Sequence, residues 1–89
     1  MDNIRTLEKQ MKALSGRKRL LIPAYLKKYK VATVSVLARE LKSKIFAISQ
    51  HLRILRTLEI VHDNRLGRAV VYRLSKQQEE PVKKVISML

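Results

Sequence analysis

The residues of this chain with the clearest chemical potential are its lysines and arginines, which number 20 in 89 residues against seven aspartates and glutamates. The formal net charge is +13, and the calculated pI is near 10.7. Acids are absent from three stretches, namely residues 12–30, 42–58 and 64–78. A cationic surplus of this size predicts a polyanionic partner, which could be a nucleic acid, an anionic membrane or an acidic protein.

The chain lacks the residue sets that catalysis or metal binding would need. It has no cysteine, which excludes disulfides and thiolate metal ligands. Its two histidines, His51 and His62, have no nucleophile or carboxylate at a spacing that suggests a catalytic set. A chain of this length also has little interior for a substrate cleft. We therefore expect no enzyme, no cofactor and no bound metal.

The apolar composition indicates a folded domain that does not enter a membrane. Hydrophobic residues make up 46 % of the chain, which argues against a disordered basic tail. The longest apolar stretch, residues 20–26, contains Pro23 and is too short to cross a bilayer, so we expect no membrane partner. Three tyrosines and one phenylalanine are few for a protein that stacks the bases of single strands.

The elements that must carry the basic residues can be predicted from apolar spacing. Ile48, Leu52 and Leu55, separated by steps of four and three, form one stripe of the kind that an amphipathic helix presents. Helices are expected over residues 3–14, 17–30, 36–42, 45–58 and 78–88.

Particular residues suggest where these helices begin. Pro23 fits the second helix if that helix starts near Leu20 or Leu21, or if it is kinked. Ser35 is expected to cap the helix over residues 36–42. Pro81 and the acids before it are typical of the first turn of the last helix.

A strand of two or three residues at most is expected within residues 31–34, and short strands are expected over residues 60–64 and 69–74. The last of them alternates with a period of two, and Gly67 suits the turn of a hairpin. Two helices joined by a tight turn and followed by a basic hairpin predict a winged helix-turn-helix. The fold class is therefore mainly α (α+β), in a single domain over residues 1–89.

Residues 33–74, about half of the chain, resemble the winged-helix core of the ArsR-like bacterial and archaeal repressors. The run TVSVLAREL at 33–41 is similar to the "T-V-S-E-L-A-x-x-L" helix of that family, and ISQHLRILR at 48–56 is similar to its recognition helix, commonly "V-S-R-H-L-K-x-L-R". Ile60-Val61, Gly67-Arg68 and residues 71–74 resemble the "L-V…G-R…Y-x-L" pattern of its wing.

The chain departs from the family pattern in three ways. Lys42 stands in the turn between the two helices, and Glu59 follows the recognition helix, where the family usually has glycine. A left-handed conformation at Glu59 would cost about 1 kcal/mol. The thiol ligands of the metal-sensing members are absent, which excludes a thiolate sensor.

The resemblance implies that helix 45–58 lies in the major groove of DNA. Glutamine can bond an adenine edge and arginine a guanine edge, while apolar side chains contact thymine methyl groups. The alternative is that the outer face of this helix is merely solvated, but the absence of acids from residues 42–58 favours DNA. Base contacts are expected from Phe46, Ala47, Gln50 and Arg53.

Contacts to the DNA backbone are expected from the start of helix 45–58, from the start of the second helix and from the wing over residues 62–73. Helix starts favour phosphates, and arginines at a hairpin tip suit a phosphate or the minor groove. The alternative for the wing is a charged tip that prevents edge-to-edge pairing. The candidates are Lys44, Ser49, Arg56, Arg65, Arg68, Arg17 and Lys18.

The terminal segments, residues 1–15 and 78–89, are expected to be dimerisation helices. Their apolar stripes exceed what a small core can absorb, and the first and last helices of resembling families pair across a two-fold axis. The alternative is that both helices pack only on their own core. The interface candidates are Ile4, Leu7, Met11, Val82, Val85, Ile86 and Leu89.

These features together predict a homodimeric, sequence-specific transcription regulator that binds duplex DNA. We expect it in the cytoplasm at the nucleoid, or in the host-cell cytoplasm if the chain is viral. One alternative is an architectural or chromatin protein that binds DNA by charge alone. Another is a protein-interaction winged-helix module in a larger transcription or RNA complex.

Overall fold

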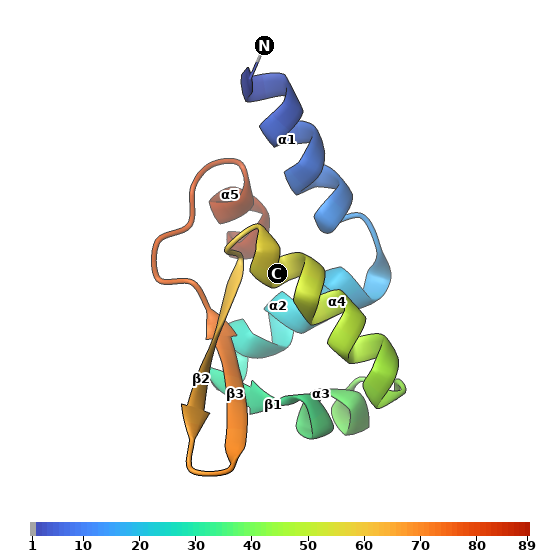
Figure 1. Cartoon of the computed structure of the whole chain (residues 1–89). Coiled ribbons are helices and arrows are strands. Elements are labelled where there is room, and N and C mark those ends of the chain that lie inside the picture. The colour runs from blue at the N-terminus through green and yellow to red at the C-terminus, as the bar shows by residue number, and fades with distance from the viewer. Residues whose placement is uncertain (1) are drawn as a thin grey trace.

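Helices form where apolar residues recur at helical spacing, and a small antiparallel sheet closes one side of them (Figure 1). The computed structural model describes residues 2–89 and the side chains of residues 3–89, so Met1 of the expected 1–15 segment lies outside the described residues. The helices are α1 (Asp2–Ala13), α2 (Arg17–Tyr29), α3 (Val34–Glu40), α4 (Ile45–Thr57) and α5 (Val82–Ser87). This α+β architecture confirms the predicted winged helix-turn-helix.

The sheet contains three strands in the order β1-β3-β2, and they are β1 (Val31–Thr33), β2 (Val61–Leu66) and β3 (Ala69–Leu74). In the hairpin, Val61 lies opposite Leu74 and Leu66 lies opposite Ala69, so β2 is longer than the predicted strand over residues 60–64. Gly67 turns the hairpin with a φ of 63°, a conformation that glycine adopts without a steric cost. β1 joins the free edge of β3, with Ala32 opposite Tyr72.

The core lies between the helices and one face of this sheet. The three inward residues of α4 meet Ile22 and Leu26 of α2, Leu37 of α3 and Val61 of β2 in one hydrophobic cluster. Every buried side chain among residues 3–89 that belongs to this core is apolar. The complete set is Ala13, Leu14, Ile22, Leu26, Ala32, Leu37, Ala38, Ile48, Leu52, Leu55, Ile60, Val61, Val82 and Ile86.

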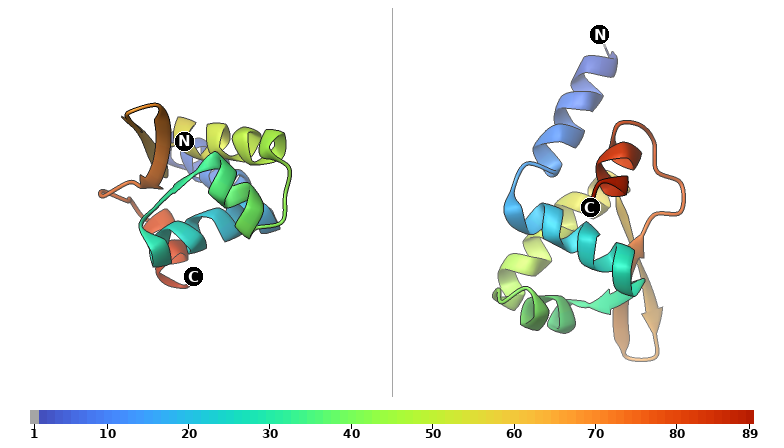
Figure 2. Two further views of the ribbon diagram at one scale, coloured as in Figure 1. Left: turned by 90° about the horizontal axis from the view of Figure 1, so that it is seen from below. Right: turned by 180° about the vertical axis from the view of Figure 1, so that it is seen from behind.

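α1 extends away from this body, so that the domain measures 42 × 23 × 21 Å (Figures 1 and 2). Only its last turn joins the core, through Ala13 and the following Leu14. Ile4, Leu7 and Met11 remain exposed, with 68 % of the Ile4 surface accessible. A contiguous apolar stripe exposed on an amphipathic helix is typical of an interaction surface.

Two predicted helix starts are wrong. α3 begins at Val34, and its cap is Thr33, whose Oγ1 accepts the Val36 N–H at 3.2 Å, so Ser35 lies inside the helix. α2 begins at Arg17, as the predicted range 17–30 has it, so Pro23 lies inside the helix, on its buried side, and the helix does not start near Leu20 or Leu21. Val34 belongs to α3, and the first strand, Val31–Thr33, has the predicted length of at most three residues.

The second wrong start is that of the last helix, which begins at Val82 and not at Gln78. Gln78 is engaged elsewhere, because its side-chain Nε2 donates to the carbonyl oxygens of Ile60 at 2.8 Å and Ser75 at 3.1 Å. These bonds hold the segment before α5 against the start of β2. α5 is correspondingly short and ends at Ser87.

Two helices end in the same backbone motif with an unfavourable residue at its centre. After α4, the Ile60 N–H donates to Leu55 O and the Glu59 N–H donates to Arg56 O, both at 2.9 Å. This is the Schellman arrangement, whose central residue is left-handed and usually glycine. Glu59 has a φ of 58°, and Lys42 occupies the equivalent position after α3 with a φ of 52°.

We predict that Lys42→Gly and Glu59→Gly each raise the free energy of unfolding by about 0.5–1 kcal/mol, because glycine removes the steric cost of the left-handed conformation. Urea denaturation followed by far-ultraviolet circular dichroism measures the change. Gln50→Gly, an exposed position within α4, is the matched control and should lower stability by about 1 kcal/mol. Destabilisation by all three substitutions would contradict this account of the helix ends.

Candidate nucleic-acid interface

α4 presents a fixed outer face because its inner face is completely buried. Ile48, Leu52 and Leu55 have no accessible surface, and each contributes about 1.5–3 kcal/mol by leaving water. On the other side, Ser49, Gln50 and Arg53 are exposed, as the predicted base-contact face requires. Ala47 is half-buried and therefore offers only part of its methyl group.

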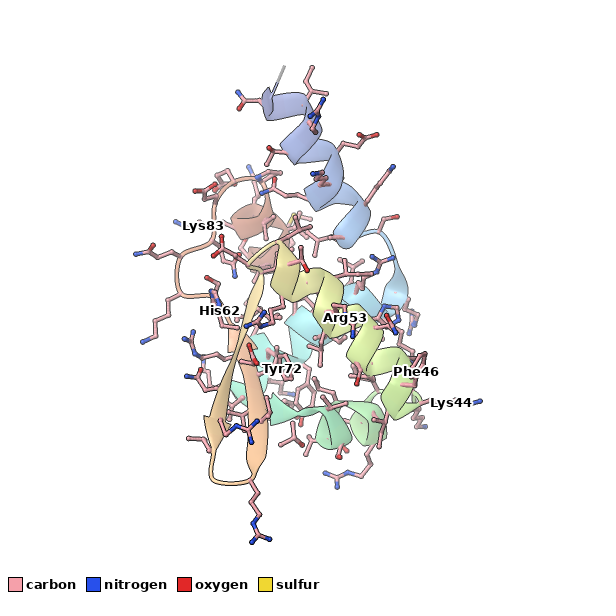
Figure 3. The ribbon with its side chains drawn as sticks, in the orientation of Figure 1. Lys44, Phe46, Arg53, His62, Tyr72 and Lys83 are labelled. Atoms are coloured by element: carbon pink, nitrogen blue, oxygen red, sulfur yellow. The ribbon has the colours of Figure 1, made fainter. Side chains whose placement is uncertain are left out.

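The start of α4 forms a cationic and apolar end of this face. Phe46 is 74 % exposed and lies beside Lys44 at one end of the helix, with Arg53 nearly two turns further along (Figure 3). Lys44 holds the position before the first helical residue, and no acid occurs in the first turn. The positive end of the helix dipole and the lysine charge therefore add at the same place.

The wing extends beside α4 and ends in two exposed arginines. Arg65 and Arg68 flank the Gly67 turn, and both are exposed, as is the apolar Leu66 between them. Arg73, further along β3, is half-buried and donates from Nε to the Asn64 side chain at 3.3 Å.

An ion pair connects α4 to the wing. Arg56, near the end of α4, donates from Nε to the Asp63 carboxylate of β2. This hydrogen bond holds the pKa of Asp63 below its ordinary value and raises the pKa of Arg56. The sequence predicts Arg56 only as a phosphate contact, because nothing in the local sequence indicates a partner seven residues away.

The two candidate phosphate contacts at the start of α2, Arg17 and Lys18, lie in different surroundings. Lys18 is half-buried, and its Nζ donates to the Leu41 carbonyl at 2.5 Å, in the turn between α3 and α4. Arg17 is exposed. Lys18 therefore braces the helix-turn-helix, a role that its place in a run of three bases did not reveal.

His51 packs beneath the outer face of α4. Its Nδ1 is buried, and within residues 3–89 it has no hydrogen-bond partner. Burial, together with the positive charges of Arg19 and Lys18, lowers the pKa of His51 below its ordinary value. The imidazole is therefore neutral near pH 7 and adds no charge to the interface.

The terminal residues expected at a dimer interface lie in two different surroundings. Val82 and Ile86 are buried in the core of the single chain, and Val85 packs against it. These α5 residues therefore do not form an open surface. Ile4, Leu7, Met11 and Leu89 are exposed, and so is Met88.

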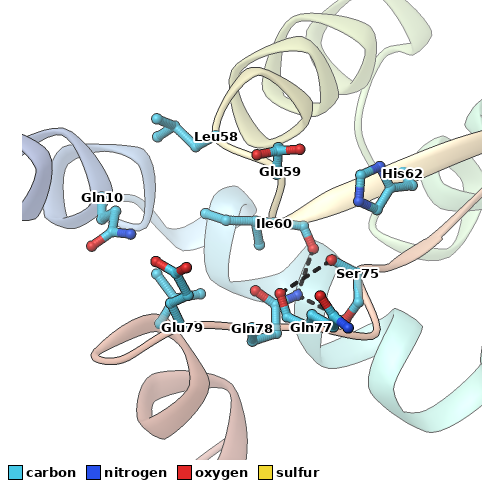
Figure 4. A pocket seen from close by; sticks show the side chains of 10 residues that line it. Gln10, Leu58, Glu59, Ile60, His62, Ser75, Gln77, Gln78 and Glu79 are labelled. Carbon is cyan, nitrogen blue, oxygen red and sulfur yellow. Dashed lines mark hydrogen bonds between the residues drawn. The ribbon is translucent and has the colours of Figure 1, made fainter.

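A hollow of about 370 Å³ lies between α1, the end of α4 and the segment before α5 (Figure 4). Glu59 and Glu79 line it together with His62 and polar side chains, including Gln78. Among the side chains of residues 3–89, no group of three or more histidines, cysteines or acids could hold a metal ion. None of the described helices combines the length and the apolar character needed to cross a membrane.

The fold and this face define a winged helix-turn-helix regulator, and solved structures of such proteins are similar to the chain over nearly its whole length. HlyU of Vibrio cholerae in its reduced form is 30 % identical with a TM-score of 0.83, covering 99 % of this chain and 88 % of that one. NolR of Sinorhizobium fredii is 28 % identical with a TM-score of 0.84, covering 98 % and 83 %. The transcriptional regulator HlyU of Vibrio vulnificus is 29 % identical with a TM-score of 0.78, covering 98 % and 86 %.

The chain belongs to the ArsR-like family of winged helix-turn-helix transcriptional regulators. It is accordingly a regulator of transcription and not an enzyme. No family model and no curated protein sequence matches it.

Proposed function

We propose that this protein regulates transcription as a homodimer that binds a specific sequence in duplex DNA, with α4 in the major groove. The observation that carries this proposal is the outer face of α4, which exposes basic and polar side chains together with Phe46 and has no acid, while its inner face is fully buried. A surface helix in ordinary solvent usually mixes both charge signs. Such a regulator acts in the cytoplasm, at the nucleoid.

Base recognition is assigned to four side chains along the exposed face of α4. Gln50 suits an adenine edge and Arg53 suits N7 and O6 of guanine, because each can form two hydrogen bonds there. Phe46 and Ala47 offer apolar surface to thymine methyl groups, and Phe46 is the more exposed of the two.

Backbone contacts are assigned to residues that surround this face. Lys44 and Ser49 lie near the positive end of α4, where phosphates bind favourably. Arg65 and Arg68 at the wing tip suit a phosphate or the minor groove. The remaining candidates are Arg17, Arg56 through its terminal nitrogens, and Lys18, which would have to share its bond to Leu41.

Dimerisation is assigned chiefly to the uncovered stripe of α1. Ile4, Leu7 and Met11 lie on one side of a helix that extends from the body, and Leu89 is exposed near the other terminus. Val82, Val85 and Ile86 would support such an interface from within the core, by holding α5 in place. Two copies related by a two-fold axis would bring two α4 helices to half-sites about one turn apart.

The main alternative is an architectural protein that binds DNA by charge, and the net charge of +13 favours it. We predict that selection from random duplexes yields a palindromic consensus, and that Arg53→Ala weakens binding to it by about 1–3 kcal/mol and relaxes one position in each half-site. Lys83→Ala in α5 removes one charge that is not among the assigned DNA contacts and lies away from Phe46 and Lys44 at the start of α4, so it should leave the consensus unchanged (Figure 3). No enrichment would support charge-only binding, and an unchanged preference in Arg53→Ala would disprove the groove assignment.

We predict that Leu7→Glu converts a micromolar solution of the protein from dimer to monomer, because a carboxylate would lie unpaired in the apolar interface. Sedimentation velocity measures the change. Thr6→Glu, on the opposite side of α1, has the same charge change and should remain dimeric. A monomeric unmodified protein at this concentration, or equal effects of both substitutions, would count against the α1 interface.

A further inference from the structure

A second hollow lies apart from the proposed DNA-binding face. It has a volume of about 310 Å³ and lies where the end of α2 meets β1 and the end of β3. No residue of α3, α4 or the wing tip lines it. The residues that do are Leu26, Lys27, Lys30, Val31, Arg73, Leu74 and Lys76.

Four positive charges surround an apolar floor in this hollow. Leu26 and Leu74 belong to or pack against the core, and Val31 beside them is 51 % exposed, which is high for an aliphatic residue of a strand. Lys27, Lys30, Arg73 and Lys76 supply the charge, and no acid accompanies them in the lining. The site therefore has both an apolar surface and a strong preference for negative charge.

The cations of this hollow lack a charged partner within residues 3–89, where the ion pairs involve Lys12, Arg39 and Arg56 instead. Lys27 Nζ donates to the Ser87 carbonyl at 3.1 Å, and Lys30 Nζ donates to the Lys27 carbonyl at 3.4 Å. These acceptors are neutral, and a carboxylate would form shorter and stronger hydrogen bonds with the same donors.

We propose that this hollow binds a small amphipathic anion, in which one carboxylate meets the lysines and an alkyl or aryl body covers Val31 and Leu74. The volume lies at the lower end of the range for small-molecule sites, about 300–1,000 Å³. A DNA phosphate would satisfy the cations but would leave the apolar floor exposed, so the floor favours the small ligand.

Arg73 connects this hollow to the wing. Its Nε donates to the side chain of Asn64 in β2 at 3.3 Å, and it lies opposite His62 in the hairpin. A carboxylate would compete with Asn64 for the guanidinium, because the charged acceptor is the stronger one. Binding would thereby alter the wing and the affinity for DNA. This regulatory consequence rests on the proposed function, whereas the binding itself does not.

The test is calorimetric titration of the full chain with octanoate and with 2-naphthoate, in the absence of DNA. We expect one site per chain for at least one of them, with a Kd of about 1 mM or tighter. Binding should weaken by about tenfold in the double variant Lys30→Gln/Lys76→Gln. The matched control Lys83→Gln/Lys84→Gln, which removes the same charge from α5, should bind as the unmodified protein does.

A neutral probe and a purely ionic probe test separately whether the site needs the charge and the apolar body of the ligand. 1-Octanol lacks the charge and inorganic phosphate lacks the apolar body, so each should bind at least about tenfold more weakly than the better carboxylate. Failure of both carboxylates to bind, equal losses in the two double variants, or phosphate binding as tight as that of the carboxylates would overturn the site. None of these readouts uses DNA, so they are independent of the test of DNA selectivity.

Discussion

The complete burial of one stripe of α4 is the constraint on which the rest of the structure depends. Ile48, Leu52 and Leu55 can leave water only if α2, α3 and the start of β2 close around them. Once they are buried, the rotation of α4 about its axis is fixed, and Gln50 and Arg53 must point outward. A base-reading face gains precision when it stands on a rigid element, because the contacts then need little ordering upon binding. The same packing that stabilises the domain therefore orients the face that we propose binds DNA.

A hydrogen bond and an ion pair hold the elements before and after α4 in position relative to this helix. Lys18 donates to the Leu41 carbonyl and so braces the turn before α4, while the Arg56–Asp63 ion pair connects its end to the wing. Exposed ion pairs contribute little to stability, so the value of the second bond lies in the relative position of helix and hairpin. Lys42 and Glu59 also help to set the position of α4. Both adopt a left-handed backbone conformation, which is strained for residues other than glycine, where the chain turns sharply before and after α4.

The sequence was sufficient for the elements and the fold class because apolar periodicity records which faces are buried. It was less informative where a residue far away along the chain determines where an element begins or which of its faces is buried. The last helix starts at Val82 because Gln78 bonds the Ile60 carbonyl, 18 residues away, and no local pattern contains that bond. Likewise, the stripes of α1 and α5 look equivalent, yet Val82 and Ile86 enter the core while Ile4 and Leu7 stay exposed. Ser35 is the expected cap of α3, but the cap is Thr33, where the backbone is extended.

Methylation interference tests most directly whether α4 reads DNA from the major groove, as we propose. Dimethyl sulfate modifies N7 of guanine in the major groove and N3 of adenine in the minor groove. On a selected duplex, guanine methylation should block binding in two clusters about one helical turn apart, related by two-fold symmetry. Adenine methylation should interfere only at the positions that the wing reaches. Binding that tolerates guanine N7 methylation throughout the site would contradict the account.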